Sequence, residues 1–93
     1  MSGKLAVLLR QMISKASISP TRTTLTRGLT ISVRRAPFCE VEISLTRTDK
    51  TAPSQQEATT VINALGWQNA YTRESRTRRG LPCIVIYEGK SLL

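Results

Sequence analysis

The chain has 93 residues and carries 14 lysines and arginines against six aspartates and glutamates, which gives a net charge of +8 at pH 7. A chain of this length forms one small domain, and its positive charge favours polyanionic partners over a small-molecule substrate. It has no histidine and only two cysteines, Cys39 and Cys83, too few ligands for a zinc site. No stretch reaches the roughly 18 apolar residues of a membrane span. We therefore predict no membrane span and no cofactor.

The first 38 residues carry seven basic residues and no acidic residue, so nearly all of the net charge lies there. Apolar residues recur at helical spacing between Lys4 and Ala16 while basic and polar residues fill the other side, which predicts a basic amphipathic helix. The stretch from Ser17 to Gly28 is rich in Ser, Thr and Arg and is predicted as a loop. Alternation from Leu29 to Val33 then predicts a short strand.

Residues 1–37 allow more than one interpretation. Their composition is typical of a mitochondrial targeting segment, cut near Arg35, which would place the mature protein in the mitochondrial matrix. Alternatively, the first helix packs on the sheet and Leu29–Val33 pairs with Cys39–Leu45 as a hairpin, which suits a cytoplasmic protein equally well. A helix lying on an anionic membrane surface is a third interpretation. The sequence favours the first.

The clearest structural signals follow one another from Cys39 to Gly66. Apolar and polar residues alternate from Cys39 to Leu45, which predicts a strand with one buried face. The sequence Ser54-Gln55-Gln56-Glu57 has the spacing of a helix capping box. An apolar stripe follows at offsets of three and four, and Gly66 stands where a left-handed C-cap is expected. The segment is predicted as a strand, a basic turn and an amphipathic helix.

The last third adds a short strand beginning at Ala70 and a buried strand over Cys83–Tyr87. Between them lies a predicted arginine-rich loop that Gly80 closes. Both cysteines fall on apolar runs, so we expect packed free thiols, with a disulfide between them as the lesser alternative. The expected fold is α+β, a small antiparallel sheet of three or four strands packed with one or two helices. Residues 38–93 would form this small α+β domain.

Catalysis is not indicated by these residues. Without histidine, the usual serine and cysteine nucleophiles have no proton acceptor, so we predict that the protein is not an enzyme. Of the acidic residues, Glu57 belongs to the predicted cap and Glu74 lies among arginines. A binding surface remains, because cations cluster after the central strand, beside a helix N-terminus that favours anions, and in the arginine-rich loop. The predicted RNA-binding residues are Arg47, Lys50, Arg73, Arg76, Arg78 and Arg79.

Three short motifs resemble the large-subunit ribosomal protein L-thirty family. They are the run from Val41 to Thr48, the helix end Ala64-Leu65-Gly66, and Thr77-Arg78-Arg79-Gly80-Leu81. The resemblance covers Val41 to Tyr87 and implies a βαβαβ domain that binds large-subunit ribosomal RNA beside neighbouring ribosomal proteins. It places Arg47 at the family's strand-end position and Arg79-Gly80 at its Arg-Gly step. A basic targeting segment ahead of such a domain suits a mitochondrial ribosome.

The sequence is also compatible with two other classes of function. In a winged-helix DNA-binding protein, Ser54–Leu65 would be the recognition helix and Tyr71–Tyr87 a hairpin wing. In a basic protein inhibitor from a mobile element, the same positive surface would bind an acidic protein. We predict architectural RNA binding in the large ribosomal subunit, with these two as alternatives.

Overall fold

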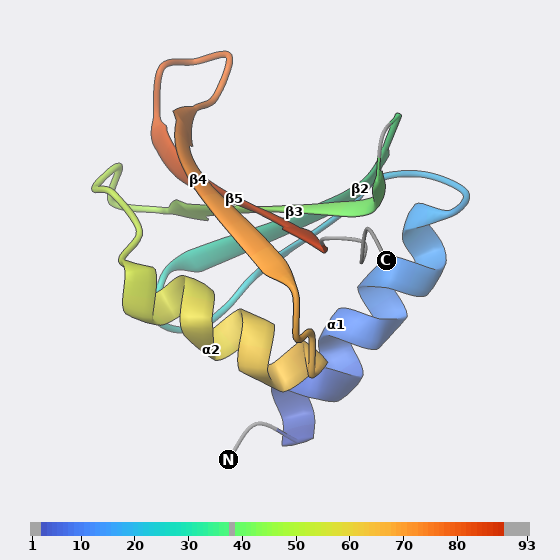
Figure 1. Ribbon diagram of the computed structural model, residues 1–93. Coiled ribbons are helices and arrows are strands. Elements are labelled where there is room, and N and C mark those ends of the chain that lie inside the picture. The colour runs from blue at the N-terminus through green and yellow to red at the C-terminus, as the bar shows by residue number, and fades with distance from the viewer. Residues whose placement is uncertain (1–2, 38, 89–93) are drawn as a thin grey trace.

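The computed structural model describes residues 3–37 and 39–88 as one antiparallel sheet with two helices on one of its faces (Figure 1). In chain order the elements are α1 (Gly3–Ala16), β1 (Thr21–Thr24), β2 (Leu29–Ala36), β3 (Cys39–Arg47), α2 (Gln55–Leu65), β4 (Ala70–Arg76) and β5 (Pro82–Glu88). The strands lie in the order β1-β2-β3-β5-β4. The predicted α+β class is confirmed, with five strands instead of three or four. None of the described helices covers the opposite face of the sheet, which we call the open face.

The two halves of the chain share one core. Leu9, Met12 and Ala16 of α1 are buried, and β2 pairs with β3 in a register that places Ile31 opposite Leu45. The first helix therefore packs on the sheet, as the second interpretation of residues 1–37 expects, and a targeting role stays a prediction. None of the described helices is both long and apolar enough to cross a bilayer.

The first strand lies where the sequence predicts a loop, so that prediction is wrong for Thr21–Thr24. These four residues, Thr-Arg-Thr-Thr, include no apolar side chain, so the alternation that identifies a half-buried strand is missing. Two contacts hold β1 in place at the edge of the sheet. It pairs with β2 along its length, and the Thr21 hydroxyl donates a hydrogen bond of 3.2 Å to the carbonyl oxygen of Met12 in α1.

Helix α2 begins and ends as the sequence predicts. The amide of Glu57 donates to the Ser54 hydroxyl, and the Glu57 carboxylate accepts a hydrogen bond from the Ser54 amide, which completes the capping box. At the other end Gly66 has φ = +72° and its amide donates to the carbonyls of Ile62 and Asn63. A residue without Cβ adopts this left-handed geometry at the lowest cost.

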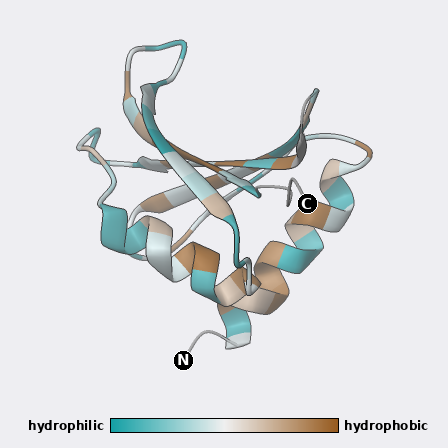
Figure 2. Ribbon diagram, in the orientation of Figure 1, coloured by the Kyte–Doolittle hydropathy of each residue, from teal (hydrophilic) through white to brown (hydrophobic). Residues whose placement is uncertain are grey.

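The central strands separate an apolar face from a hydroxyl-rich face. Isoleucines and leucines of β2, β3 and β5 meet under the helices, where Ile31, Ile43, Leu45, Ile84 and Ile86 are at most 2% exposed. Residues of the opposite parity, such as Ser32 and Ser44, therefore point to the open face. In Figure 2 brown segments lie on the central strands and on both helices, and teal segments lie at the tip of the β4–β5 hairpin.

The region predicted as an arginine-rich loop is mostly strand. Arg73 and Arg76 belong to β4, which pairs with β5 along its whole length, and only Thr77–Leu81 connects the two strands. The loop prediction failed because β4 is an edge strand exposed on both faces, where charged residues need not alternate with apolar ones. The second helix implied by the ribosomal resemblance does not occur between α2 and β5 in the described chain; β4 takes that place.

Candidate nucleic-acid interface

Residues of β1, β2, β3 and two loops surround a hollow of about 570 Å³ on the open face of the sheet, which we call the basic hollow. Its lining consists of hydroxyl and basic residues with a single leucine: Arg22, Thr24, Thr30, Ser32, Ser44, Thr46, Arg47, Thr48, Lys50, Thr77, Arg78, Arg79 and Leu81. Seven of these side chains carry a hydroxyl and five carry a positive charge, and none carries a carboxylate. The hollow therefore offers hydrogen-bond donors and acceptors inside a positive field.

Most of the positive charge in the basic hollow is not paired with any described residue. Four of its five cations form no side-chain hydrogen bond or ion pair within residues 3–37 and 39–88: Arg22, Lys50, Arg78 and Arg79. All four are exposed to solvent. The four positive charges around the hollow repel one another, and an anion between them would relieve that repulsion.

The register of the sheet creates the row of hydroxyls. Thr24 of β1 lies opposite Thr30 of β2, and Thr30 lies opposite Thr46 of β3, so three threonines form one line across three strands. The hydroxyl oxygens of Thr24 and Thr30 are 2.9 Å apart and share a hydrogen bond. In the neighbouring row Arg22 lies opposite Ser32, and Ser32 lies opposite Ser44. Cross-strand neighbours on one face thus supply a polar floor.

A tight turn brings Arg78 and Arg79 to the rim of the basic hollow. The Gly80 amide donates to the Thr77 carbonyl at 2.9 Å, the Thr77 amide donates to the Leu81 carbonyl at 2.9 Å, and Gly80 has φ = +81°. The two arginines are therefore the central residues of the turn. Pairing between β3 and β5 ends at Leu45 and Ile84, and Pro82, which lies two residues before Ile84 in the chain, has no amide hydrogen to donate. Beyond that point the hairpin extends past the sheet (Figure 1).

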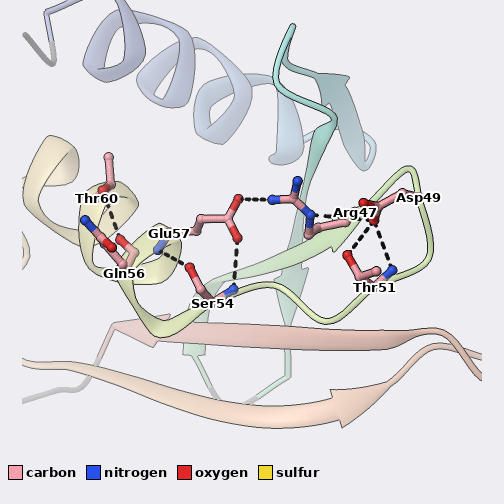
Figure 3. A network of polar contacts seen from close by, with 7 residues as sticks. All are labelled: Arg47, Asp49, Thr51, Ser54, Gln56, Glu57 and Thr60. Carbon is pink, nitrogen blue, oxygen red and sulfur yellow. Dashed lines mark hydrogen bonds and ion pairs between the residues drawn. The ribbon is translucent and has the colours of Figure 1, made fainter.

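Arg47 differs from the other four cations because its charge is compensated within the protein (Figure 3). Its Nη1 lies 2.6 Å from Oε2 of Glu57, and its Nε lies 3.6 Å from Oδ1 of Asp49. The same Glu57 carboxylate accepts the amide of Ser54 at the start of α2. Arg47 therefore ties the end of β3 to the start of α2. The chain's own carboxylate occupies the place beside the helix N-terminus where the sequence predicts an anion.

The loop after Arg47 is held by its own side chains. The Thr51 hydroxyl and the Thr51 amide both donate to Oδ1 of Asp49. These two hydrogen bonds, with the positive charge of Arg47, hold the pKa of the Asp49 carboxyl below its ordinary value of 3.8. The carboxylate thus stays ionised and fixes the loop that presents Lys50 to the hollow.

The six predicted binding residues do not share one surface. Arg47, Lys50, Arg78 and Arg79 line the basic hollow. Arg73 of β4 lies on the same open face but outside the lining of the hollow, and its guanidinium lies over the ring of Tyr87. Arg76 has the opposite parity and donates to the carbonyl oxygen of Gly80 at 2.7 Å. Arg22 and the hydroxyl residues were not among the predicted binding residues. Strand pairing places them: β1 pairs with β2 to bring in Arg22 and Thr24, and β2 pairs with β3 to bring in Ser44 and Thr46.

The chain matches no known protein family, no curated protein and no solved structure. Its function is therefore inferred from the surface itself. No cluster of three or more potential metal ligands occurs in the described part of the chain, and Cys83 there is a buried free thiol, as predicted for that residue. The side chain of Cys39 lies outside the described residues.

Lys50 offers a direct test of whether the hollow binds anions. It has φ = +69°, a left-handed conformation that costs a residue with Cβ about 1 kcal/mol. We expect Lys50→Gly to raise the free energy of unfolding by about 0.5–1 kcal/mol, measured by urea denaturation, and to weaken binding of an RNA oligonucleotide. Asparagine also tolerates this left-handed conformation, so Lys50→Asn is the matched control that removes the charge without introducing glycine. Increased stability with unchanged RNA affinity would remove Lys50 from the interface.

Proposed function

We propose that the protein binds RNA through the basic hollow and acts as an architectural component of a ribonucleoprotein particle. The observation that carries this proposal is the convergence of seven hydroxyls and four cations, unpaired within the described part of the chain, on a lining that holds no carboxylate. Arginine and lysine would neutralise phosphates and supply most of the affinity. The hydroxyls can donate to and accept from the ribose 2′-hydroxyl, the group that distinguishes RNA from DNA.

The large ribosomal subunit, in the mitochondrial matrix, is the particle that we propose on the basis of the sequence resemblance and the acid-free first half of the chain. A small basic domain with a single polyanion-binding face suits a position against ribosomal RNA and beside other ribosomal proteins. Sedimentation of native extract tests this assignment. The protein should migrate with the large subunit through a high-salt gradient and leave that fraction after nuclease treatment.

The surface favours RNA over duplex DNA read by a recognition helix. Helix α2, the candidate recognition helix, contains no lysine or arginine between Gln55 and Leu65. Its buried residues Ala58, Val61 and Ala64 pack against the sheet, on the side opposite the basic hollow. A helix that reads the major groove needs a free, cationic side. An inhibitor of an acidic protein remains the alternative, and it would copurify with one protein after nuclease treatment.

Salt dependence of binding tests the proposed function directly. A fluorescent RNA oligonucleotide of about 12 nucleotides would be titrated with the full chain, in parallel with duplex DNA, at several salt concentrations between 50 and 300 mM. Four phosphate contacts predict a slope of about −3 for log K against log salt concentration with a single strand. An affinity that does not depend on salt, or no binding at 50 mM salt, would exclude the basic hollow as a polyanion site.

A further inference from the structure

Two tyrosines and an arginine form a second cluster on the open face, beyond the basic hollow. Tyr71 of β4 lies directly opposite Tyr87 of β5. The Arg73 guanidinium lies 5.9 Å from the centroid of the Tyr87 ring, and its Nη2 donates to the Tyr87 hydroxyl at 3.2 Å. Tyr71 is 63% exposed and no other described side chain forms a hydrogen bond with it.

The register places this cluster on the same face as the hollow. Val85 of β5 lies opposite Ser44 of β3, which lines the hollow, and Tyr87 lies two residues farther along β5. Side chains two residues apart on a strand share a face and are roughly 7 Å apart. Tyr71 and Arg73 have the same parity, since they lie opposite Tyr87 and Val85. One continuous face therefore runs from the basic hollow to the two tyrosines.

The cluster has a different character from the hollow. Glu42 of β3 lies opposite Tyr87, and Arg34 of β2 lies opposite Glu42. Nη2 of Arg34 lies 2.8 Å from Oε2 of Glu42 in an ion pair, so this end of the open face offers little free charge for phosphates. Tyr71 sits on an edge strand and contributes nothing to the buried core. An exposed aromatic ring beside an arginine plane is what a nucleobase needs for stacking and for a cation–π contact.

We propose that Tyr71, Arg73 and Tyr87 form a base-stacking site, and that the ligand of the open face is single-stranded RNA. This inference rests on the proposed function, because the phosphates would lie in the basic hollow while a base leaves the strand and stacks on Tyr71. A duplex keeps its bases stacked on one another and cannot offer a free ring there. Tyr71 and Arg73 are the residues that would select single strands.

The test places a fluorescent reporter at the stacking position. Trp67 is replaced by phenylalanine, and tryptophan is then introduced by Tyr71→Trp or, as the matched control, by Thr72→Trp. Thr72 is the next residue of the same exposed strand and points to the opposite face. An unlabelled single-stranded RNA should strongly quench the tryptophan fluorescence of the Tyr71→Trp variant and leave that of the Thr72→Trp variant nearly unchanged. Equal quenching at both positions would overturn the stacking site.

Affinity measurements separate this inference from the proposed function. In the native sequence, Tyr71→Ala should weaken binding of single-stranded RNA about 5- to 100-fold without changing the salt slope, while Tyr71→Phe should bind normally. If Tyr71→Ala binds as tightly as the native chain, or duplex RNA binds as tightly as a single strand, the stacking site is wrong and the basic hollow stands. If the native chain binds no RNA, the proposed function fails and the stacking site with it.

Discussion

Replacing Leu9 with alanine is expected to lower the free energy of unfolding by about 2–4 kcal/mol. Leu9 is 0% exposed and belongs to the same core cluster as Ile31 and Ile43 of the sheet, so the substitution leaves a cavity between α1 and the strands. A domain of this size is stabilised by only about 5–10 kcal/mol in total. Urea denaturation followed by circular dichroism would measure the loss as a lower transition midpoint with an unchanged slope.

Val7→Ala is the matched control for that experiment. Val7 lies in the same helix, is 55% exposed and is absent from the core cluster, so its replacement should change stability by less than about 0.5 kcal/mol. Equal, small effects at both positions would mean that α1 does not pack on the sheet in solution. That outcome would favour the interpretation of residues 1–37 as a targeting segment that is not part of the folded domain.

The helix α2 could be predicted because its signals are local. The capping box joins Ser54 to Glu57, three residues apart, and the C-cap needs only Gly66 and the preceding turn. Each of these contacts forms within one turn of the chain, so short sequence patterns determine it. The buried alternation of β3 and the apolar run of β5 were equally visible, since both strands lie at the centre of the sheet.

The edge strands β1 and β4 could not be predicted in full, for the opposite reason. Both lie at the margins of the sheet, and neither has a buried residue, so neither shows a hydrophobic pattern. Backbone hydrogen bonds to β2 and β5 create them, and such pairing follows from the tertiary fold. The arginines at 73 and 76 consequently appeared to belong to one loop, although strand geometry turns them to opposite faces.

The residues of the candidate site could likewise be predicted only in part. The dense basic segment led to the prediction of Arg78 and Arg79, and the place of Lys50 beside a helix start led to its prediction; all three line the basic hollow. Arg22 required the register in which it lies opposite Ser32, a contact that spans ten residues of chain. Arg47 was identified as a binding residue, and the structure instead gives it two carboxylate partners. Pairing of charges in space therefore separates Arg47, whose charge is compensated within the fold, from the cations that have no partner among the described residues.

Reversing the charges at the hairpin tip should have the largest effect on binding. We expect the double substitution Arg78→Glu and Arg79→Glu to weaken RNA binding at least tenfold at 100 mM salt, and to reduce the salt slope from about −3 to about −1.5. Both arginines are exposed and have no described hydrogen-bond or ion-pair partner, so the fold loses no contact. The thermal midpoint should stay within a few degrees of the native value.

The β1–β2 turn provides a matched control for the second of these two arginines, Arg79. In Leu25-Thr26-Arg27-Gly28-Leu29 the Gly28 amide donates to Leu25 at 2.9 Å and the Leu25 amide donates to Leu29 at 2.8 Å, as in the Thr77–Leu81 turn. Arg27 thus occupies the turn position that Arg79 occupies, but it lines a separate hollow, beside α1 and α2. Arg27→Glu and Arg79→Glu change the net charge equally. If both weaken binding to the same extent, overall charge and not the basic hollow holds the RNA, because only a localised site distinguishes two equivalent turns.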